Sequence, residues 1–248
     1  MCGIVGYLGD REALPILLDG LKRLEYRGYD SAGVALYQRD KIQTFRVKGK
    51  IKELEDQLRN NALPGRVGLG HTRWATHGKP CKRNAHPHLG CDSALAVVHN
   101  GIIENYLKLK EELIKEGHQF HSDTDTEVIA HLIERHFQGD LEEAVRKALK
   151  EVEGSYALAV ISVEDPDKIV AARYRSPLIV GLGEGECFLA SDIPAILNHT
   201  RDQVTLGEGE MVVITRQGLE IKELRNGIRI VPEPKKILWD PVQAEKAG

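Results

Sequence analysis

An α+β fold, in which helices sandwich antiparallel sheets, is predicted by the order of elements along the 248-residue chain. Short apolar segments bounded by turn residues, typical of strands, occur in the first hundred residues and again after residue 155. Between them lie three segments in which apolar residues recur at helical spacing. Strands, helices and further strands in separate runs are typical of layered α+β domains.

The first 33 residues predict a strand, a helix and a loop. Residues 3–8 (GIVGYL) are apolar and predict a short buried strand. The next segment predicts a helix with Asp10 as its cap and Pro15 in its first turn, because leucines recur at helical spacing: Leu14, Leu17, Leu18, Leu21 and Leu24. Residues 26–33 (YRGYDSAG) break this pattern with two glycines and predict a loop.

The following residues predict a hairpin, a small helix and two further strands. Residues 33–38 and 41–47 are expected to pair across a short Arg-Asp turn. Apolar residues in the next segment mark a small charged helix, closed by a loop over 60–65; they are Ile51, Leu54 and Leu58. A strand begins within 65–74, and a long polar loop separates it from a second strand over 94–100.

Three helices are predicted next. The first stops at Gly117 and carries Ile103, Tyr106, Leu107 and Ile114. The second begins at Thr124, which forms a capping box with Glu127, and buries Val128, Ile129, Leu132 and Ile133. The third begins at Asp140 and ends at Gly154.

The last part of the chain predicts strands over 155–163, 168–175, 177–183, 186–191, 203–207, 210–217 and 219–225, with a short helix over 192–199. The tail is rich in proline and charge, which is typical of a linker. We therefore expect residues 1–237 to form one domain and residues 238–248 to lead toward another.

Composition narrows the functional classes. The formal charge of -3 leaves no general basic field for nucleic acid. Apolar runs are too short to cross a membrane, and no signal-peptide pattern precedes the first strand. The four cysteines do not form a disulfide framework in a chain of this size. We expect a cytoplasmic protein that binds neither nucleic acid nor membranes.

Cys2 follows the initiator methionine directly, and this position changes the chemistry of its thiol. Methionine aminopeptidases remove Met1 when the next side chain is small. The thiol and a free α-amine, with an ordinary pKa of about 7.7–8.0, would then share one carbon atom. An N-terminal amine that acts as base for its own side chain activates a nucleophile. The alternative is a small buried apolar cysteine.

Polar residues collect in four loop segments, 26–33, 71–78, 99–106 and 122–127. Each lies at the end of a strand or the start of a helix, where scaffolds present working groups. The segments offer Arg73 for a carboxylate, Asp125 for an ammonium group, and Asn100 with Gly101 as donors for an oxyanion. This inventory suits a free amino acid. The alternatives are a surface cation at Arg73 and, at Asp125, an acid favoured by a helix dipole.

Several motifs resemble one known family over essentially the whole chain. They are CGIVG at the start, RLEYRGYDSAG, HTRWATHG, NAHPH, VVHNGIIENY and TDTEVIAHLI. In this order they are similar to the glutaminase domains of the glutamine:fructose-6-phosphate aminotransferase family. Related amidotransferases of purine or asparagine synthesis share only the CGI and RG-x-D-S parts.

The resemblance implies an N-terminal-nucleophile hydrolase fold, a four-layer αββα sandwich with two antiparallel sheets. It implies that Cys2 forms a γ-glutamyl thioester and releases ammonia, and that Asn100 and Gly101 form the oxyanion hole. Arg27 and Gly28 would hold the N-terminus in place.

The resemblance also implies a site for L-glutamine. Arg73 would bind the α-carboxylate and Asp125 the α-ammonium group, while Thr76 and His77 shape the substrate loop. Trp74 would lie beside the ammonia exit. No cofactor and no metal are implied. The partner would be a sugar-phosphate isomerase domain absent from this chain, and a homodimer is expected only of the full-length enzyme.

Two other functions remain open at this point. The chain could serve another acceptor, as the glutaminase half of a purine or asparagine pathway enzyme. It could also bind glutamine without turnover, because a retained Met1 would acylate the amine of Cys2.

Three further patterns have simpler explanations. Residues of zinc-ligand type occur at Cys81, His86, His88 and Cys91. Their order fits no standard zinc finger, so a solvated His-Pro turn is favoured. Cys187 is expected to be a buried strand thiol. Residues 180–186 (VGLGEGE) loosely resemble a phosphate-binding loop, but a hairpin turn explains them better.

Overall fold

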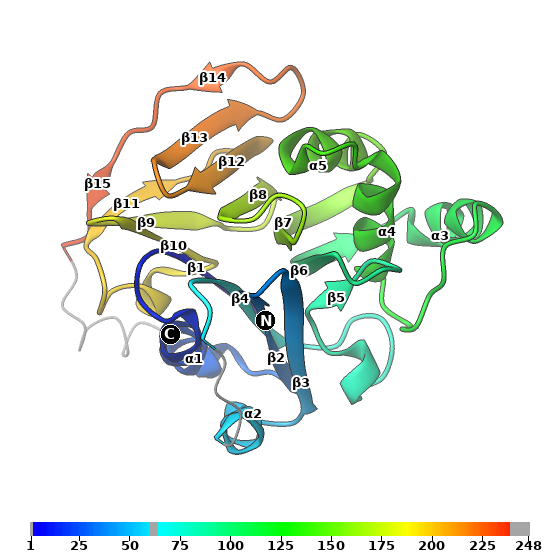
Figure 1. The fold of residues 1–248 in the computed structure, drawn as a ribbon, viewed down its shortest axis with the longest axis horizontal. Coiled ribbons are helices and arrows are strands. Elements are labelled where there is room, and N and C mark those ends of the chain that lie inside the picture. Colours follow the sequence, from blue (N-terminus) through cyan, green and yellow to red (C-terminus); the bar gives the residue numbers. More distant parts are fainter. Residues whose placement is uncertain (1, 60–63, 239–248) are drawn as a thin grey trace.

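Two antiparallel β-sheets stacked face to face form the centre of the protein (Figure 1). The structure is a computed structural model and describes residues 2–59 and 64–238. Within them, the first sheet has the strand order β15-β11-β9-β10-β1-β4-β2-β3, and the second has the order β14-β13-β12-β8-β7-β6-β5. The α+β prediction is confirmed.

The strands of each sheet come from both halves of the chain. The first sheet consists of β1 (Gly3–Leu8), β2 (Ser31–Gln38), β3 (Lys41–Lys48), β4 (Val67–Arg73), β9 (Ile179–Gly183), β10 (Glu186–Ala190), β11 (Asp202–Thr205) and β15 (Lys235–Lys236). The second consists of β5 (His88–Leu89), β6 (Leu95–Ile103), β7 (Gly154–Ser162), β8 (Lys168–Tyr174), β12 (Glu210–Thr215), β13 (Gly218–Glu223) and β14 (Arg229–Ile230).

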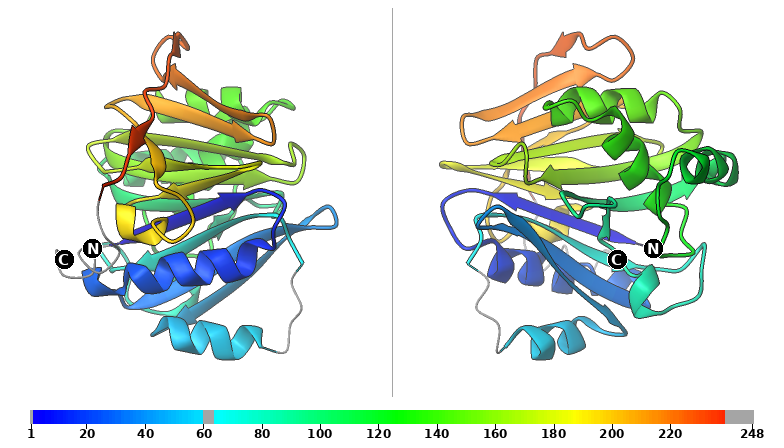
Figure 2. Two further views of the ribbon diagram at one scale, coloured as in Figure 1. Left: turned by 90° about the vertical axis from the view of Figure 1, so that its left-hand side faces the viewer. Right: turned by 45° about the vertical axis from the view of Figure 1, so that its right-hand side comes forward.

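Helices cover the outer face of each sheet (Figure 2). The first sheet packs against α1 (Ala13–Arg23) and α2 (Ile51–Leu58), and the second against α3 (Tyr106–Lys115), α4 (Glu127–His136) and α5 (Leu141–Leu149). Short 3-10 helices are η1 (Glu25–Arg27), η2 (Lys82–Asn84) and η3 (Ile193–Ala195). Within the described ranges no helix is long and apolar enough to span a membrane.

The three large apolar clusters among the described residues follow these layers. In β1, Ile4 and Leu8 face the second sheet, whereas Val5 and Tyr7 face the α1 side, because successive side chains of a strand alternate between its faces. A third cluster joins α4 and α5 to the second sheet. The four layers are therefore helix, sheet, sheet and helix.

Two predicted helix caps are wrong. Helix α1 begins after Glu12 without a side-chain cap, and Asp10 forms an ion pair with Arg216 at 3.0 Å. Helix α4 begins at Glu127, whose carboxylate accepts hydrogen bonds from the backbone N–H groups of His121 and Ser122, at 2.8 and 2.7 Å. Glu127 therefore holds the preceding loop rather than a Thr124 capping box. The predicted cap at Asp140 is confirmed, since its side chain accepts from the N–H groups at 142 and 143.

Several boundaries also differ from the prediction. The loop expected over 26–33 overlaps the end of η1, and β2 already begins at Ser31. The helix expected over 192–199 shortens to η3, and α5 ends at Leu149 rather than at Gly154. The predicted β9–β10 hairpin is confirmed, with Gly185 in its turn at a φ of 69°. The expected loop residues 60–63 and linker residues 239–248 lie outside the described residues.

Helix α3 presents a different face to the core from the one predicted. It begins at Tyr106, because Ile103 still belongs to β6. Its buried residues are Leu109 and Leu113, whereas Leu107 is 62% exposed and Ile114 is 52% exposed. Both pairs of apolar residues fit a helical period, and the pair that packs toward the core is Leu109 with Leu113.

The predicted solvated His-Pro turn is also wrong, because His86 and His88 are buried. Their rings lie 4.8 Å apart, and the ring of His86 lies 4.2 Å from that of His71 on β4. Burial lowers the pKa of His71 to about 3, and it lowers the pKa values of His86, His88 and His99 as well. These four imidazoles are neutral in the folded protein at pH 7.

We expect Leu109→Ala to lower the free energy of unfolding by about 2–5 kcal/mol, because it removes a buried side chain and leaves a cavity. Leu107→Ala, on the exposed face of the same helix, should change it by less than about 0.5 kcal/mol. Urea unfolding of both variants measures the difference. Equal losses would mean that Leu107 is also covered.

We expect the free energy of unfolding to decrease as the pH is lowered below about 6.5. In this range the unfolded chain binds protons at these histidines, while the folded protein keeps them neutral. The unfolded state binds more protons, so the free energy of unfolding rises with pH in this window. His88→Gln, which retains a donor toward Thr124, should reduce that slope by up to about 1.4 kcal/mol per pH unit. Urea unfolding at pH 5.5, 6.5 and 8 provides the slopes, and an unchanged slope in the variant contradicts the burial argument.

Candidate active site

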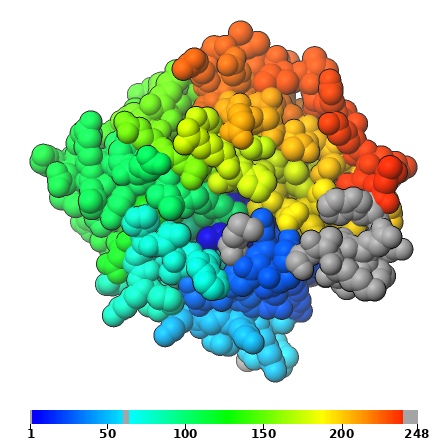
Figure 3. Space-filling model, turned by 180° about the vertical axis from the view of Figure 1, so that it is seen from behind, coloured from blue at the N-terminus to red at the C-terminus, as the bar shows by residue number. Residues whose placement is uncertain are grey.

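A cavity of about 380 Å³ opens where the start of β1 meets the ends of β4 and β6. Six of the ten predicted site residues line it: Cys2, Arg27, Trp74, Thr76, Asn100 and Gly101. Figure 3 shows the dark blue start of the described chain reaching the surface between the blue and cyan segments. A larger cavity, of about 660 Å³ and lined in part by Lys150, Tyr174 and Glu208, contains none of the predicted residues.

The Cys2 thiol is half-buried and contacts the backbone of Trp74. The Trp74 N–H donates to Sγ at 3.2 Å, and Sγ lies 3.6 Å from the Trp74 carbonyl oxygen. Burial raises the pKa of the Cys2 thiol, although the Trp74 N–H acts in the opposite direction. The thiol is therefore protonated at pH 7 and needs a base before it can act as a nucleophile.

A hydrogen bond from His71 determines the orientation of the Asn100 amide. His71 Nε2 lies 2.9 Å from Asn100 Oδ1 and 3.0 Å from the carbonyl oxygen of His99. Both partners only accept, so Nε2 carries the hydrogen of the neutral imidazole. The Nδ2 donor of Asn100 then points toward Cys2, whose carbonyl oxygen it reaches at 3.3 Å. His71 received no role from the sequence, although it stands in the HTRWATHG motif.

Gly101 has a backbone conformation that excludes side chains. Its φ is +136°, and a Cβ at this position would lie 2.0 Å from the carbonyl oxygen of Ser155 on the neighbouring strand. Only glycine allows β6 and β7 to approach here. The residue therefore presents bare backbone to the cavity beside Asn100.

Arg27 contacts the predicted nucleophile directly. Its Nη1 donates to the carbonyl oxygen of Cys2 at 3.2 Å and to Ser191 Oγ at 3.0 Å. Ser191 Oγ also accepts from the Ile4 N–H at 3.0 Å, so it joins Arg27 to β1. Ser191 was not among the predicted residues. It directly follows the β10 strand, and no local pattern distinguishes it.

Gly28 adjoins the Trp74 ring. Its φ is +73°, and a Cβ here would lie 3.1 Å from that ring. Trp74 itself is 54% exposed and lies at the rim of the cavity. The small residue at 28 therefore leaves room for the indole.

Arg73, His77 and Asp125 form a linked group, but none of them lines the cavity. The buried Arg73 guanidinium donates to the carbonyl oxygens of His77 and Gly78. Its Nη1 lies 3.9 Å from Asp30 and makes no hydrogen bond within the described part of the chain. His77 Nδ1 lies 3.8 Å from Asp125, whose carboxylate accepts from the Ile103 N–H at 2.8 Å.

The arrangement combines a thiol with an oriented amide donor and a bare stretch of backbone. Such a set can add a thiol to a carbonyl carbon and stabilise the resulting oxyanion. The buried guanidinium and the buried carboxylate nearby are suited to the two charged groups of an amino acid.

Comparison with known proteins relates the chain to amidotransferases. The family described as "Glutamine amidotransferase domain" matches residues 71–198. Glutamine–fructose-6-phosphate aminotransferase (isomerizing) of Clostridium tetani is 53% identical over 248 residues, covering 100% of this chain and 41% of that protein. The enzyme of the same name from Aquifex aeolicus is 54% identical over 251 residues, covering 100% of this chain and 42% of that protein. The chain thus spans about two fifths of the length of these relatives.

Solved structures agree in fold. Glutamine phosphoribosylpyrophosphate amidotransferase from B. subtilis superimposes with a TM-score of 0.79 and 28% identity, covering 92% of this chain and 50% of that one. The predicted αββα sandwich of N-terminal-nucleophile type is confirmed by this likeness and by the four layers described above. The chain belongs to the glutamine amidotransferase domain family.

Proposed function

We propose that the chain hydrolyses L-glutamine to L-glutamate and ammonia, with Cys2 as the nucleophile. The observation that carries this proposal is the single cavity lined by the Cys2 thiol, Asn100 and Gly101. Membership of the glutamine amidotransferase domain family supports glutamine as the substrate.

The reaction begins with an acid–base step at Cys2. Removal of Met1 frees the α-amine, which accepts the proton of the buried thiol. The thiolate adds to the γ-carboxamide carbon, and the N–H groups of Asn100 Nδ2 and Gly101 stabilise the oxyanion. The protonated amine then gives its proton to the departing nitrogen, so that ammonia leaves and a γ-glutamyl thioester remains. Water, deprotonated by the same amine, cleaves the thioester and restores the thiol.

The remaining predicted residues are proposed to bind the two charged groups of glutamine. Arg73 takes the α-carboxylate, since its Nη1 is buried with no hydrogen bond from the described residues. Asp125 takes the α-ammonium group. Because neither residue lines the cavity, the 74–78 loop must move as glutamine binds, so that Thr76 and His77 close over the substrate. Trp74, at the rim, borders the ammonia exit, while Arg27 and Gly28 hold the segment that carries Cys2.

We further propose that the ammonia serves fructose 6-phosphate in a longer protein. The relatives that match at 53–54% identity are named for that reaction, whereas the phosphoribosylpyrophosphate enzyme is 28% identical. The domain would end near residue 237, and a linker over 238–248 would lead to a sugar-phosphate isomerase domain. Dimerisation would belong to that full-length enzyme. All four cysteines are free, which supports a cytoplasmic setting.

Glutamate release from L-glutamine tests the proposal. Cys2→Ala should abolish release, because no other group in the cavity is a thiol. Asn100→Ala should lower kcat by about 10²–10³-fold with a smaller change in KM, as loss of one oxyanion donor does elsewhere. Cys81→Ala, outside the cavity, serves as the matched control and should retain activity.

Three outcomes oppose the proposal. Activity retained by Cys2→Ala would exclude the thioester route, and activity lost in Cys81→Ala would place the nucleophile elsewhere. Binding of glutamine by the wild-type chain without any glutamate release would mean a binding module.

A further inference from the structure

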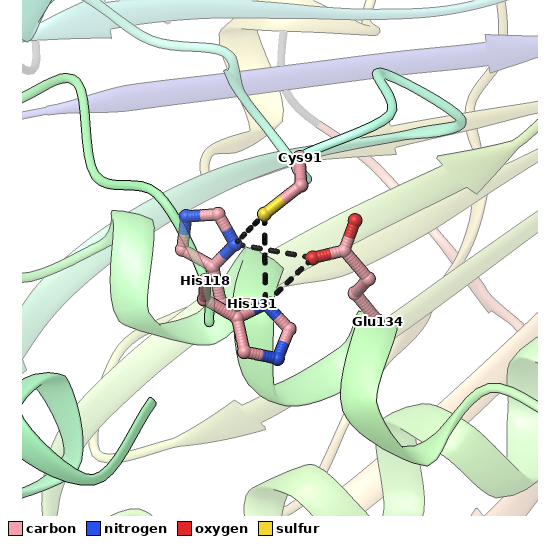
Figure 4. Close-up of side chains that lie close together, drawn as sticks. All are labelled: Cys91, His118, His131 and Glu134. Carbon is pink, nitrogen blue, oxygen red and sulfur yellow. Dashed lines mark hydrogen bonds and ion pairs between the residues drawn. The ribbon is translucent and has the colours of Figure 1, made fainter. Parts of the chain in front are cut away.

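Four side chains of metal-ligating type converge outside the proposed active site (Figure 4). Cys91 lies in the turn between β5 and β6, and His118 lies in the loop after α3. His131 and Glu134 stand three residues apart on α4, so that they share one helix face. One ligand atom from each of the four residues lies within 4.8 Å of the others.

The distances within the cluster resemble the edges of a zinc tetrahedron. A Zn–S distance of about 2.3 Å and Zn–N or Zn–O distances of about 2.1 Å place S and N about 3.6 Å apart and N and O about 3.4 Å apart. Cys91 Sγ lies 3.6 Å from His118 Nδ1 and 3.5 Å from His131 Nδ1. Glu134 Oε2 lies 2.8 and 3.2 Å from the same two nitrogens. Both contacts are shorter than the N–O edge, so Glu134 Oε2 must move outward, by about 0.6 Å from His118 Nδ1, to seat the ion.

Neighbouring groups are arranged as they are around metal ligands. The Gln119 N–H donates a hydrogen bond to Cys91 Sγ at 3.4 Å. His131 is 1% exposed, and its Nε2 has no hydrogen-bond partner within the described ranges, although Glu127 lies 3.9 Å away. Glu127 lies on the Nε2 side of the ring, where a carboxylate commonly supports a ligating imidazole, but at this distance it makes no hydrogen bond.

We propose that Cys91, His118, His131 and Glu134 bind one Zn²⁺ as a structural site. Sulfur and imidazole ligands favour zinc over calcium or magnesium. Four protein ligands leave no open position, which is typical of structural rather than catalytic zinc. The ion fastens the β5–β6 turn and the loop after α3 to helix α4. That helix begins two residues after Asp125, so the site stiffens one wall of the substrate region without touching the cavity.

The sequence pattern does not predict this site. The zinc-ligand types that lie near Cys91 in the chain are Cys81, His86 and His88, whose order with Cys91 disfavours zinc, and the two histidines pack against each other. The partners of Cys91 follow 27, 40 and 43 residues later, and only the packing of α3 and α4 brings them together.

Metal titration of the Cys2→Ala chain tests this site, because the substitution removes the thiol of the proposed active site. The chelator-treated protein is titrated with Zn²⁺ against a chromophoric chelator, and we expect one ion per chain. In that background, Cys91→Ser and His131→Gln should each weaken Zn²⁺ binding by more than about 100-fold. This exceeds the loss of metal affinity that follows when a residue behind a ligand, rather than a ligand itself, is replaced. Cys81→Ser is the matched control and should bind as tightly as the parent.

Cobalt substitution gives a readout that does not depend on the variants. Co²⁺ bound to the Cys2→Ala chain should show the intense visible bands of a tetrahedral site and a thiolate-to-cobalt charge-transfer band. Absence of that band, or equal zinc affinity in the parent and a folded Cys91→Ser chain, would overturn the proposal. Glutamate release is not a readout here, so failure of the zinc site leaves the proposed glutaminase intact.

Discussion

A buried hydrogen bond between His71 and Asn100 joins the two sheets at the point where Cys2 lies. His71 belongs to β4 of the first sheet, beside β1, and Asn100 belongs to β6 of the second. The bond sets which end of the Asn100 amide faces Cys2. The relative position of the sheets, the direction of this donor and the surroundings of the thiol are therefore determined together.

Burial favours the neutral form of both His71 and the Cys2 thiol. It lowers the pKa of His71 to about 3, which keeps the imidazole neutral and fixes its single hydrogen on Nε2. It raises the pKa of the Cys2 thiol, which therefore needs a base. In the proposed mechanism the α-amine of Cys2 is that base, so no further side chain in the cavity is required. His71 thus orients Asn100, and the predicted acid sensitivity of the fold arises from the same burial of histidines.

Much of the fold and part of the site could be predicted from sequence, for physical reasons. Strand and helix periodicity is local, so the elements could be predicted. The start of a helix also depends on which backbone N–H groups a nearby carboxylate binds, and Glu127 binds those of His121 and Ser122 rather than capping with Thr124. Cys2, Asn100 and Gly101 stand in local motifs and meet at one cavity. His71 and Ser191 were missed because their significance lies in contacts across 29 and 164 residues of chain. His86 and His88 stand in a polar segment, which by itself predicts an exposed turn. Their burial depends on other elements that pack over them and cannot be predicted from the segment alone.

Labelling of Cys2 tests the central claim most directly. The intact mass of the purified chain is measured before and after exposure to a glutamine-mimicking electrophile, and the modified residue is mapped. We expect Met1 to be absent, one adduct to form on Cys2, and excess L-glutamine to block its formation. A chain that lacks Met1 and yet leaves Cys2 unmodified would contradict an N-terminal-nucleophile mechanism.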